Sequence, residues 1–128
     1  MDFLAAHRQR VYDVIKAGMP ADTALSLYLP DDLAEQPVII VGRPSAGFRG
    51  TDLGQEVRVP VHVLGRRFND DGAQLEHDQL TDTILGILWD GEMPLIACLP
   101  TVQGIAGVPH PSYDITTLHG HTVCGCRS

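Results

Sequence analysis

The stretch EVRVPVHVL, residues 56–64, decides the fold. Four valines stand at alternate positions in it: Val57, Val59, Val61 and Val63. Arg58, Pro60 and His62 stand between them, so the pattern predicts a β-strand with one apolar face and one polar face. Pro60 has no N–H for a sheet ladder, and its amide position must therefore face an edge or a bulge. We interpret the stretch as an edge strand, which another chain or loop has to cover.

Upstream of this strand, the sequence predicts a helix over residues 2–18, which Asp2 can cap and Gly18 and Pro20 end. Its apolar residues fall mainly on one side: Leu4, Ala5, Val11, Val14 and Ile15. Two short strands are expected next. In one, Leu25, Leu27 and Leu29 alternate with polar residues, and the other is the β-branched run over 38–42.

The segment RPSAGFRGTDLG, residues 43–54, separates these strands from the long one. It contains three glycines and two arginines and has no apolar periodicity, so we expect a loop. Such a length is unusual for a connection inside a compact domain. Loops of this kind often carry contacts with partners.

Downstream, the sequence predicts a second helix from about Ala73 to Trp89, capped by Asp70 or Asp71 and ended by Gly91 and Pro94. Its apolar stripe is Ala73, His77, Leu80, Ile84, Ile87 and Leu88. The rest of the chain is β-like: a strand over 95–99, a loop-like segment over 101–109 and a long strand over 112–123.

The helices and strands do not alternate, and this order favours an α+β fold over a parallel α/β fold. We expect a mixed or mostly antiparallel sheet with two amphipathic helices packed on one face. The chain of 128 residues is the size of one domain, 1–128. Because aromatic residues make up only 5% of the chain, the core must consist mainly of Val, Ile, Leu and Ala.

The charge balance excludes broad binding to nucleic acid as the function. Sixteen acidic residues against nine basic ones give a net charge of -7. Broad binding to nucleic-acid phosphates requires clustered Lys and Arg, so we expect DNA at most to pass by the protein. The three cysteines cannot all pair, which favours a reducing compartment. We expect neither a secretory signal nor a membrane span.

The segment HGHTVCGCRS, residues 119–128, is the main candidate for metal or redox chemistry. His119 and His121 share one face of a strand, whereas Cys124 and Cys126 have the opposite parity. Four ligands converge on a tetrahedral metal only if the chain bulges at residues 122–123. We therefore expect no metal and no cofactor, and we interpret the segment as a strand end with a tail.

Three other residues are candidates for catalysis. His77 lies on the apolar stripe of the second helix and is interpreted as a residue at the core boundary. His110 lies between two prolines and is expected in a loop. Cys98 lies in the apolar run PLIACLP without the features of an activated nucleophile. No phosphate loop, dinucleotide fingerprint or nucleophile elbow occurs, and we expect no catalytic residue.

Arginine and aromatic residues flank the long strand, and these residue types are enriched where proteins meet other proteins. The predicted oligomer or partner interface is Arg43, Phe48, Arg49, Leu53, Arg58, Pro60, Arg66, Arg67 and Phe68. The alternative is that they are solvated loop residues.

Three segments in this order carry a resemblance to a known family: MDFLAAHRQRVYDVIKAG, RVPVHVLGRR and DGAQLEHDQLTDTILGILWDG, followed by two strands. The chain resembles the tail terminator, or tail-to-head joining, proteins of long-tailed bacteriophages. The resemblance implies an α+β subunit of a hexameric ring at the head–tail junction of the virion, assembled in the host cytoplasm. Its implied partners are the tail tube protein and the head-completion or connector protein, with DNA passing through the lumen.

Neighbouring functions remain open from the residues alone. Head-completion or stopper proteins of the phage neck have a similar size. A small metal protein or enzyme using His and Cys, and an adaptor that binds peptides by strand addition, are further alternatives.

Overall fold

The computed structural model describes residues 3–28, 37–48, 54–66, 71–105 and 107–122. Two helices are present in these ranges, α1 (Phe3–Gly18) and α2 (Asp71–Asp90). The strands are β1 (Leu25–Ser26), β2 (Val38–Val41), β3 (Ser45–Phe48), β4 (Gly54–Leu64), β5 (Leu95–Ile105) and β6 (Val108–Thr122). No helix among these residues is both long and apolar enough to cross a bilayer.

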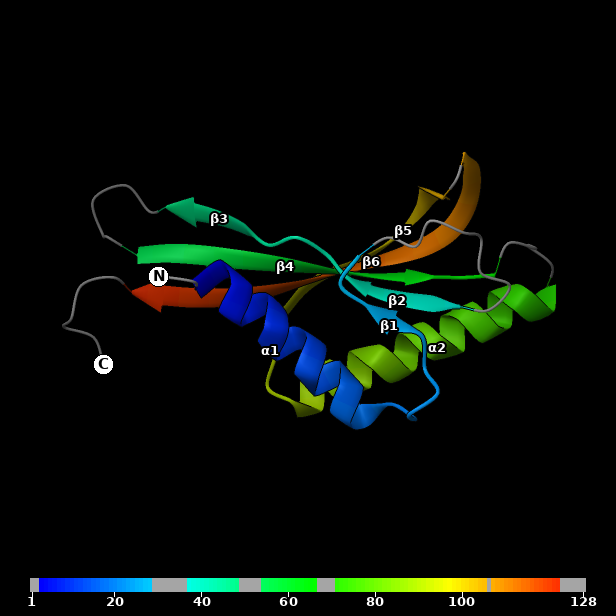
Figure 1. Ribbon diagram of the computed structural model, residues 1–128, viewed down its shortest axis with the longest axis horizontal. Coiled ribbons are helices and arrows are strands. Elements are labelled where there is room, and N and C mark those ends of the chain that lie inside the picture. Colours follow the sequence, from blue (N-terminus) through cyan, green and yellow to red (C-terminus); the bar gives the residue numbers. More distant parts are fainter. Residues whose placement is uncertain (1–2, 29–36, 49–53, 67–70, 106, 123–128) are drawn as a thin grey trace.

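The strands form one mixed sheet in the order β1-β2-β4-β6-β5, with β3 also paired to β4 (Figure 1). Only β1 and β2 run parallel, and the remaining pairs are antiparallel. Both helices pack on the same side of this sheet. The predicted α+β fold with two helices on one face is thereby confirmed.

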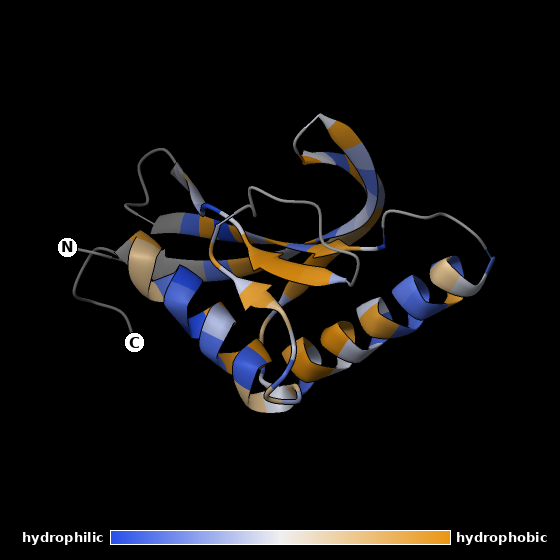
Figure 2. Cartoon of the chain, turned by 45° about the vertical axis from the view of Figure 1, so that its right-hand side comes forward, coloured by the Kyte–Doolittle hydropathy of each residue, from blue (hydrophilic) through white to orange (hydrophobic). Residues whose placement is uncertain are grey.

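The main core lies between the helices and the sheet. All four valines of the alternating stretch are fully buried, as its pattern predicts. They pack with Val11 and Ile15 of α1 and with Ile84 and Leu88 of α2. The strand next to these valines, β2, is apolar throughout and is orange along its whole length in Figure 2. Apolar burial of this kind is the dominant favourable contribution to folding, and here aliphatic side chains supply most of it.

The opposite face of the sheet carries a smaller core. The hairpin of β5 and β6 curls away from the helices at its tip (Figure 1). Ile105 at this tip packs with Val38, Ile40 and Leu64. The hairpin thus covers part of the face that has no helix.

The prediction of an edge strand over 56–64 is wrong, because β4 is paired on both sides. One side pairs with β6 along all eleven residues of β4, and the other side pairs with β2 and then β3. Between Val41↔Val61 and Ser45↔Arg58, three residues (42–44) face only two (59 and 60). This extra residue makes a bulge, the alternative that the proline also allowed.

Three further expectations required correction. The segment 43–54 is not all loop, since β3 occupies Ser45–Phe48. The segment 101–109 mostly belongs to β5 and β6, whose hairpin has Gly107 at φ 79° beside its turn. His110 is therefore not in a loop: it lies in β6 opposite Gln103 and is 1% exposed. In each case cross-strand pairing overrides a local sequence rich in glycine and proline.

The helix bounds agree closely with the predicted ones, while the first strand is shorter than predicted. β1 covers only Leu25–Ser26, and Leu29 lies outside the described residues. The proposed caps Asp2 and Asp70 also lie outside them, and Asp71 is the first residue of α2.

Candidate functional site

The bulge beside Pro60 opens a cavity in the face of the sheet that has no helix. Its volume is about 610 Å³, within the range of ligand and peptide pockets. The walls come from β2, β4, β5, α1 and the segment after β1: Arg8, Leu27, Tyr28, Ile40, Gly42, Arg43, Pro60, His62 and Gln103. We call it the bulge cavity.

The floor of the bulge cavity is held by close backbone packing. The Gly42 N–H donates to the Pro60 carbonyl at 2.7 Å. A Cβ at Gly42 would lie 2.9 Å from both His62 Nε2 and Pro60 Cγ, so a side chain at position 42 has no room. Glycine therefore allows the strand to bulge while staying against β4.

His62 is held in place by a polar cluster on the same face. Its Nδ1 lies 2.7 Å from Asp114 Oδ1, and the Ser112 hydroxyl donates to the same oxygen at 3.1 Å. Gln103 Nε2 lies 3.5 Å from His62 Nδ1. The ring stands over Gly42, so this cluster shapes the cavity floor.

Two arginines give the bulge cavity a positive rim. Arg8 crosses from α1 and donates from Nε to the Val41 carbonyl at 3.1 Å and from Nη2 to the Leu27 carbonyl. Its guanidinium lies 5.7 Å from the centre of the Tyr28 ring. Arg43 is exposed and has no hydrogen bond or ion pair with any described residue. Together with the apolar walls, this arrangement suits an occupant that is partly apolar and negatively charged.

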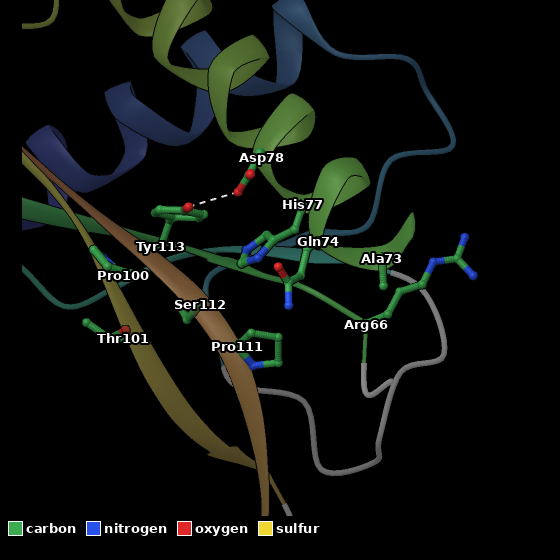
Figure 3. A pocket seen from close by; sticks show the side chains of 10 residues that line it. All are labelled: Arg66, Ala73, Gln74, His77, Asp78, Pro100, Thr101, Pro111, Ser112 and Tyr113. Carbon is green, nitrogen blue, oxygen red and sulfur yellow. Dashed lines mark hydrogen bonds between the residues drawn. The ribbon is translucent and has the colours of Figure 1, made fainter. Parts of the chain in front are cut away.

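A second cavity, of about 260 Å³, lies between α2 and the β6 strand (Figure 3). Figure 3 shows His77 and Tyr113 side by side in it, with Arg66 at its edge. His77 Nε2 donates to the Val63 carbonyl at 2.6 Å, and its ring packs on Tyr113 at 4.9 Å. The Tyr113 hydroxyl donates to Asp78 at 2.8 Å, and this hydrogen bond raises the pKa of Tyr113. These contacts tie α2 to the sheet and give His77 a structural role.

His119 lies on the helix side of the sheet. Its ring stacks on His7 of α1 at 4.8 Å, and its Nε2 lies 3.0 Å from the Thr117 hydroxyl. Burial, with smaller contributions from His7 and Arg10, lowers the pKa of His119 to about 4. The imidazole is therefore neutral at pH 7 and packs α1 against β6.

The terminal segment shows no metal site within the described residues. The register of β4 with β6 runs without a shift to Thr122, whereas Val123, Cys124 and Cys126 lie outside those residues. No group of three His, Cys, Asp or Glu side chains gathers among the described residues. Cys98 is half-buried, and burial raises the pKa of its thiol, which disfavours the reactive thiolate.

The structure separates the residues predicted for the interface. Arg43, Pro60 and Arg58 lie on one face around the bulge, and Arg58 is 4.0 Å from Glu56. Arg66 lies beyond the other end of β4 and pairs with Glu76 at 2.7 Å. Phe48 belongs to β3 by its backbone. Arg49, Leu53, Arg67 and Phe68 lie outside the described residues.

Sequence reasoning missed several residues of the bulge cavity. Arg8, Tyr28 and Gln103 are distant along the chain and come together only through the sheet order. The usable signal was local: a glycine, an arginine and a proline follow a buried strand at residues 42–44.

The outermost strand, β5, is a second candidate surface. It ends the sheet in the described part of the chain and is eleven residues long. Three of its large apolar residues are exposed: Ile96 at 46%, Leu99 at 60% and Val102 at 67%. A long edge with exposed apolar residues is prone to pair with another chain.

No protein-family model matches the chain, and no curated protein matches it.

Proposed function

We propose that the chain is a structural subunit of a bacteriophage virion, a tail terminator at the head–tail junction. In this role, copies form a hexameric ring in the host cytoplasm, cap the completed tail tube and join it to the head-completion protein. The proposal rests on the family resemblance of the sequence, and the described surface supports it.

The observation that carries the proposal is the edge of β5, which pairs with no further strand among the described residues. An edge of eleven residues with exposed Ile96, Leu99 and Val102 is an aggregation hazard for a monomer. A subunit of an assembly uses such an edge for contacts. The α+β fold is also what the resemblance implies.

The charge of α2 suits a ring through which DNA passes. The helix has no Lys or Arg, and before its last turn it exposes three aspartates: Asp71, Asp78 and Asp82. A surface of one negative sign repels phosphates, so DNA slides past it without binding.

The experiment is an assembly assay with purified protein, alone and mixed with tail tubes of the same phage. Light scattering and negative-stain microscopy should show a ring, free or at one end of the tube. Replacing Leu99 and Val102 with Asp should abolish assembly while leaving the fold intact, because both side chains are exposed. Leu75→Asp is the matched control, since Leu75 is 58% exposed on α2.

The outcomes separate the neck functions. Protein that caps tubes and stops their growth supports the terminator. Binding to filled heads without binding to tubes would assign the chain to the head-completion class. A protein that remains monomeric with both partners contradicts the proposal.

A further inference from the structure

The turn after α2 departs from the usual chemistry of helix ends. The Met93 N–H donates to the Leu88 carbonyl and the Glu92 N–H donates to the Trp89 carbonyl, which together form a Schellman motif. The residue at its left-handed position is normally glycine, but here it is Glu92, with φ 59°. Gly91 stands one position too early to take this conformation.

The same turn concentrates negative charge where a helix tolerates it least. The carbonyl end of a helix carries a partial negative charge, which favours Lys, Arg or His nearby. The last turn of α2 has no basic residue, and Asp90 and Glu92 are both exposed. Neither carboxylate pairs with a described residue. Each therefore destabilises the isolated subunit slightly.

Trp89 adds a large apolar surface to this turn. It is 72% exposed, whereas its neighbours Leu88 and Met93 are buried. Tryptophan is among the residues most enriched in interface hot spots. Residues 89–92 therefore combine a non-glycine residue in the left-handed conformation, acidic residues at a helix C-terminus and an exposed tryptophan. Such departures from local preference are typical of functional sites. We call residues 89–92 the acidic corner.

The bulge cavity has the complementary chemistry. Leu27, Ile40 and Pro60 line it with apolar atoms, while Arg8 and Arg43 place positive charge at its rim. We propose that the acidic corner of one copy inserts Trp89 into the bulge cavity of the next copy, with Asp90 and Glu92 against the arginines. This inference rests on the proposed ring and assigns a contact between its subunits in addition to the β5 edge.

The positions of the two surfaces allow such a contact to repeat. The acidic corner lies at the end of α2, on the helix side, and the bulge cavity lies on the sheet face without a helix. One copy can therefore use both surfaces at once. Contacts between two different surfaces run head to tail and close into a ring when the rotation permits.

The test measures self-association by sedimentation velocity and native mass spectrometry, alone and on tail tubes. Trp89→Ala should raise the Kd of self-association at least about 30-fold, as expected for an interface hot spot. Arg43→Asp should do the same from the other surface. Leu75→Ala, an exposed apolar truncation on the same helix, should change the Kd less than about twofold. Circular dichroism checks that each variant is folded.

Mixing the two defective variants tests the pairing itself. The intact cavity of Trp89→Ala protein accepts the intact corner of Arg43→Asp protein, so the mixture should give a 1:1 heterodimer and no ring. The double variant Asp90→Arg with Arg43→Asp exchanges the charges within the contact and should recover part of the assembly lost in each single variant.

Rings that form normally from Trp89→Ala or Arg43→Asp protein would overturn the inference while leaving the proposed function in place. Rings from the mixture would also overturn it. Wild-type protein that assembles neither alone nor on tubes would overturn the proposed function, which keeps the two failures distinct.

Discussion

Acidification should destabilise the protein through one histidine. His119 is 6% exposed, packs on His7 and lies within hydrogen-bonding distance of Thr117. Burial lowers its pKa from 6.5 to about 4. The folded chain therefore holds this ring neutral in a pH range where the unfolded chain protonates it.

The sign and size follow from proton linkage. Between pH 6.5 and 4 the unfolded state binds more protons at His119, so stability falls as the pH is lowered through this window. At about 1.36 kcal/mol for each pH unit, the difference corresponds to at most roughly 3 kcal/mol. Because solvent and salt screen the contributions of His7 and Arg10, we expect a loss of about 1 to 3 kcal/mol.

Urea denaturation at a series of pH values between 7 and 4 measures this loss. His119→Gln removes the titrating group, so its free energy of unfolding should fall less over the same window. His7→Gln, which removes one neighbouring charge, should give an intermediate result. If wild type and His119→Gln lose stability in parallel, the assignment of the acid sensitivity to His119 is wrong.

Three further predictions concern packing and backbone conformation. Ile115→Ala should lower the free energy of unfolding by about 2 to 5 kcal/mol because Ile115 is fully buried, whereas exposed Ile96→Ala should change it by less than about 0.5 kcal/mol; urea denaturation compares them. Gly42→Ala should destabilise by about 1 to 3 kcal/mol because its Cβ meets His62 and Pro60, and Gly47→Ala, with open space, is the control in thermal melts. Glu92→Gly should stabilise the monomer by about 0.5 to 1 kcal/mol by relieving the positive φ, and a lower Tm would contradict this.

The sequence predicts the secondary structure best where burial dominates. The alternating valines of β4 specify one face, and all four are fully buried. In the predicted apolar stripe of α2, His77, Ile84 and Leu88 are buried, and the other three residues are partly buried. The sequence predicts that Gly91 and Pro94 end the second helix, and α2 ends at Asp90. The residue that takes the left-handed conformation after it is Glu92 and not a glycine. Local patterns predict the existence of an element better than its cap.

The parts that the sequence could not predict depend on pairing between distant strands. β3 lies in a segment that contains three glycines and a proline, and the tip of the β5–β6 hairpin is rich in glycine and proline. The strand character of both comes from partners across the sheet. The prediction of a loop at His110 is wrong for the same reason. Similarly, the bulge cavity joins Arg8, Tyr28 and Gln103, whose proximity no local pattern encodes.

The wrong prediction for Pro60 and the location of the bulge cavity have one physical origin. A proline inside a central strand has no N–H, so one carbonyl of the neighbouring strand lacks a donor at that point. The chain responds by placing three residues, 42–44, opposite residues 59 and 60. Because of the extra residue, Arg43 lies outside the paired ladder and lines the cavity. Gly42 stays hydrogen-bonded to Pro60 through its backbone N–H. A residue that suggested an edge therefore creates a break inside the sheet. This break supplies both the space and a positive charge with no partner among the described residues, and the proposed subunit contact requires both.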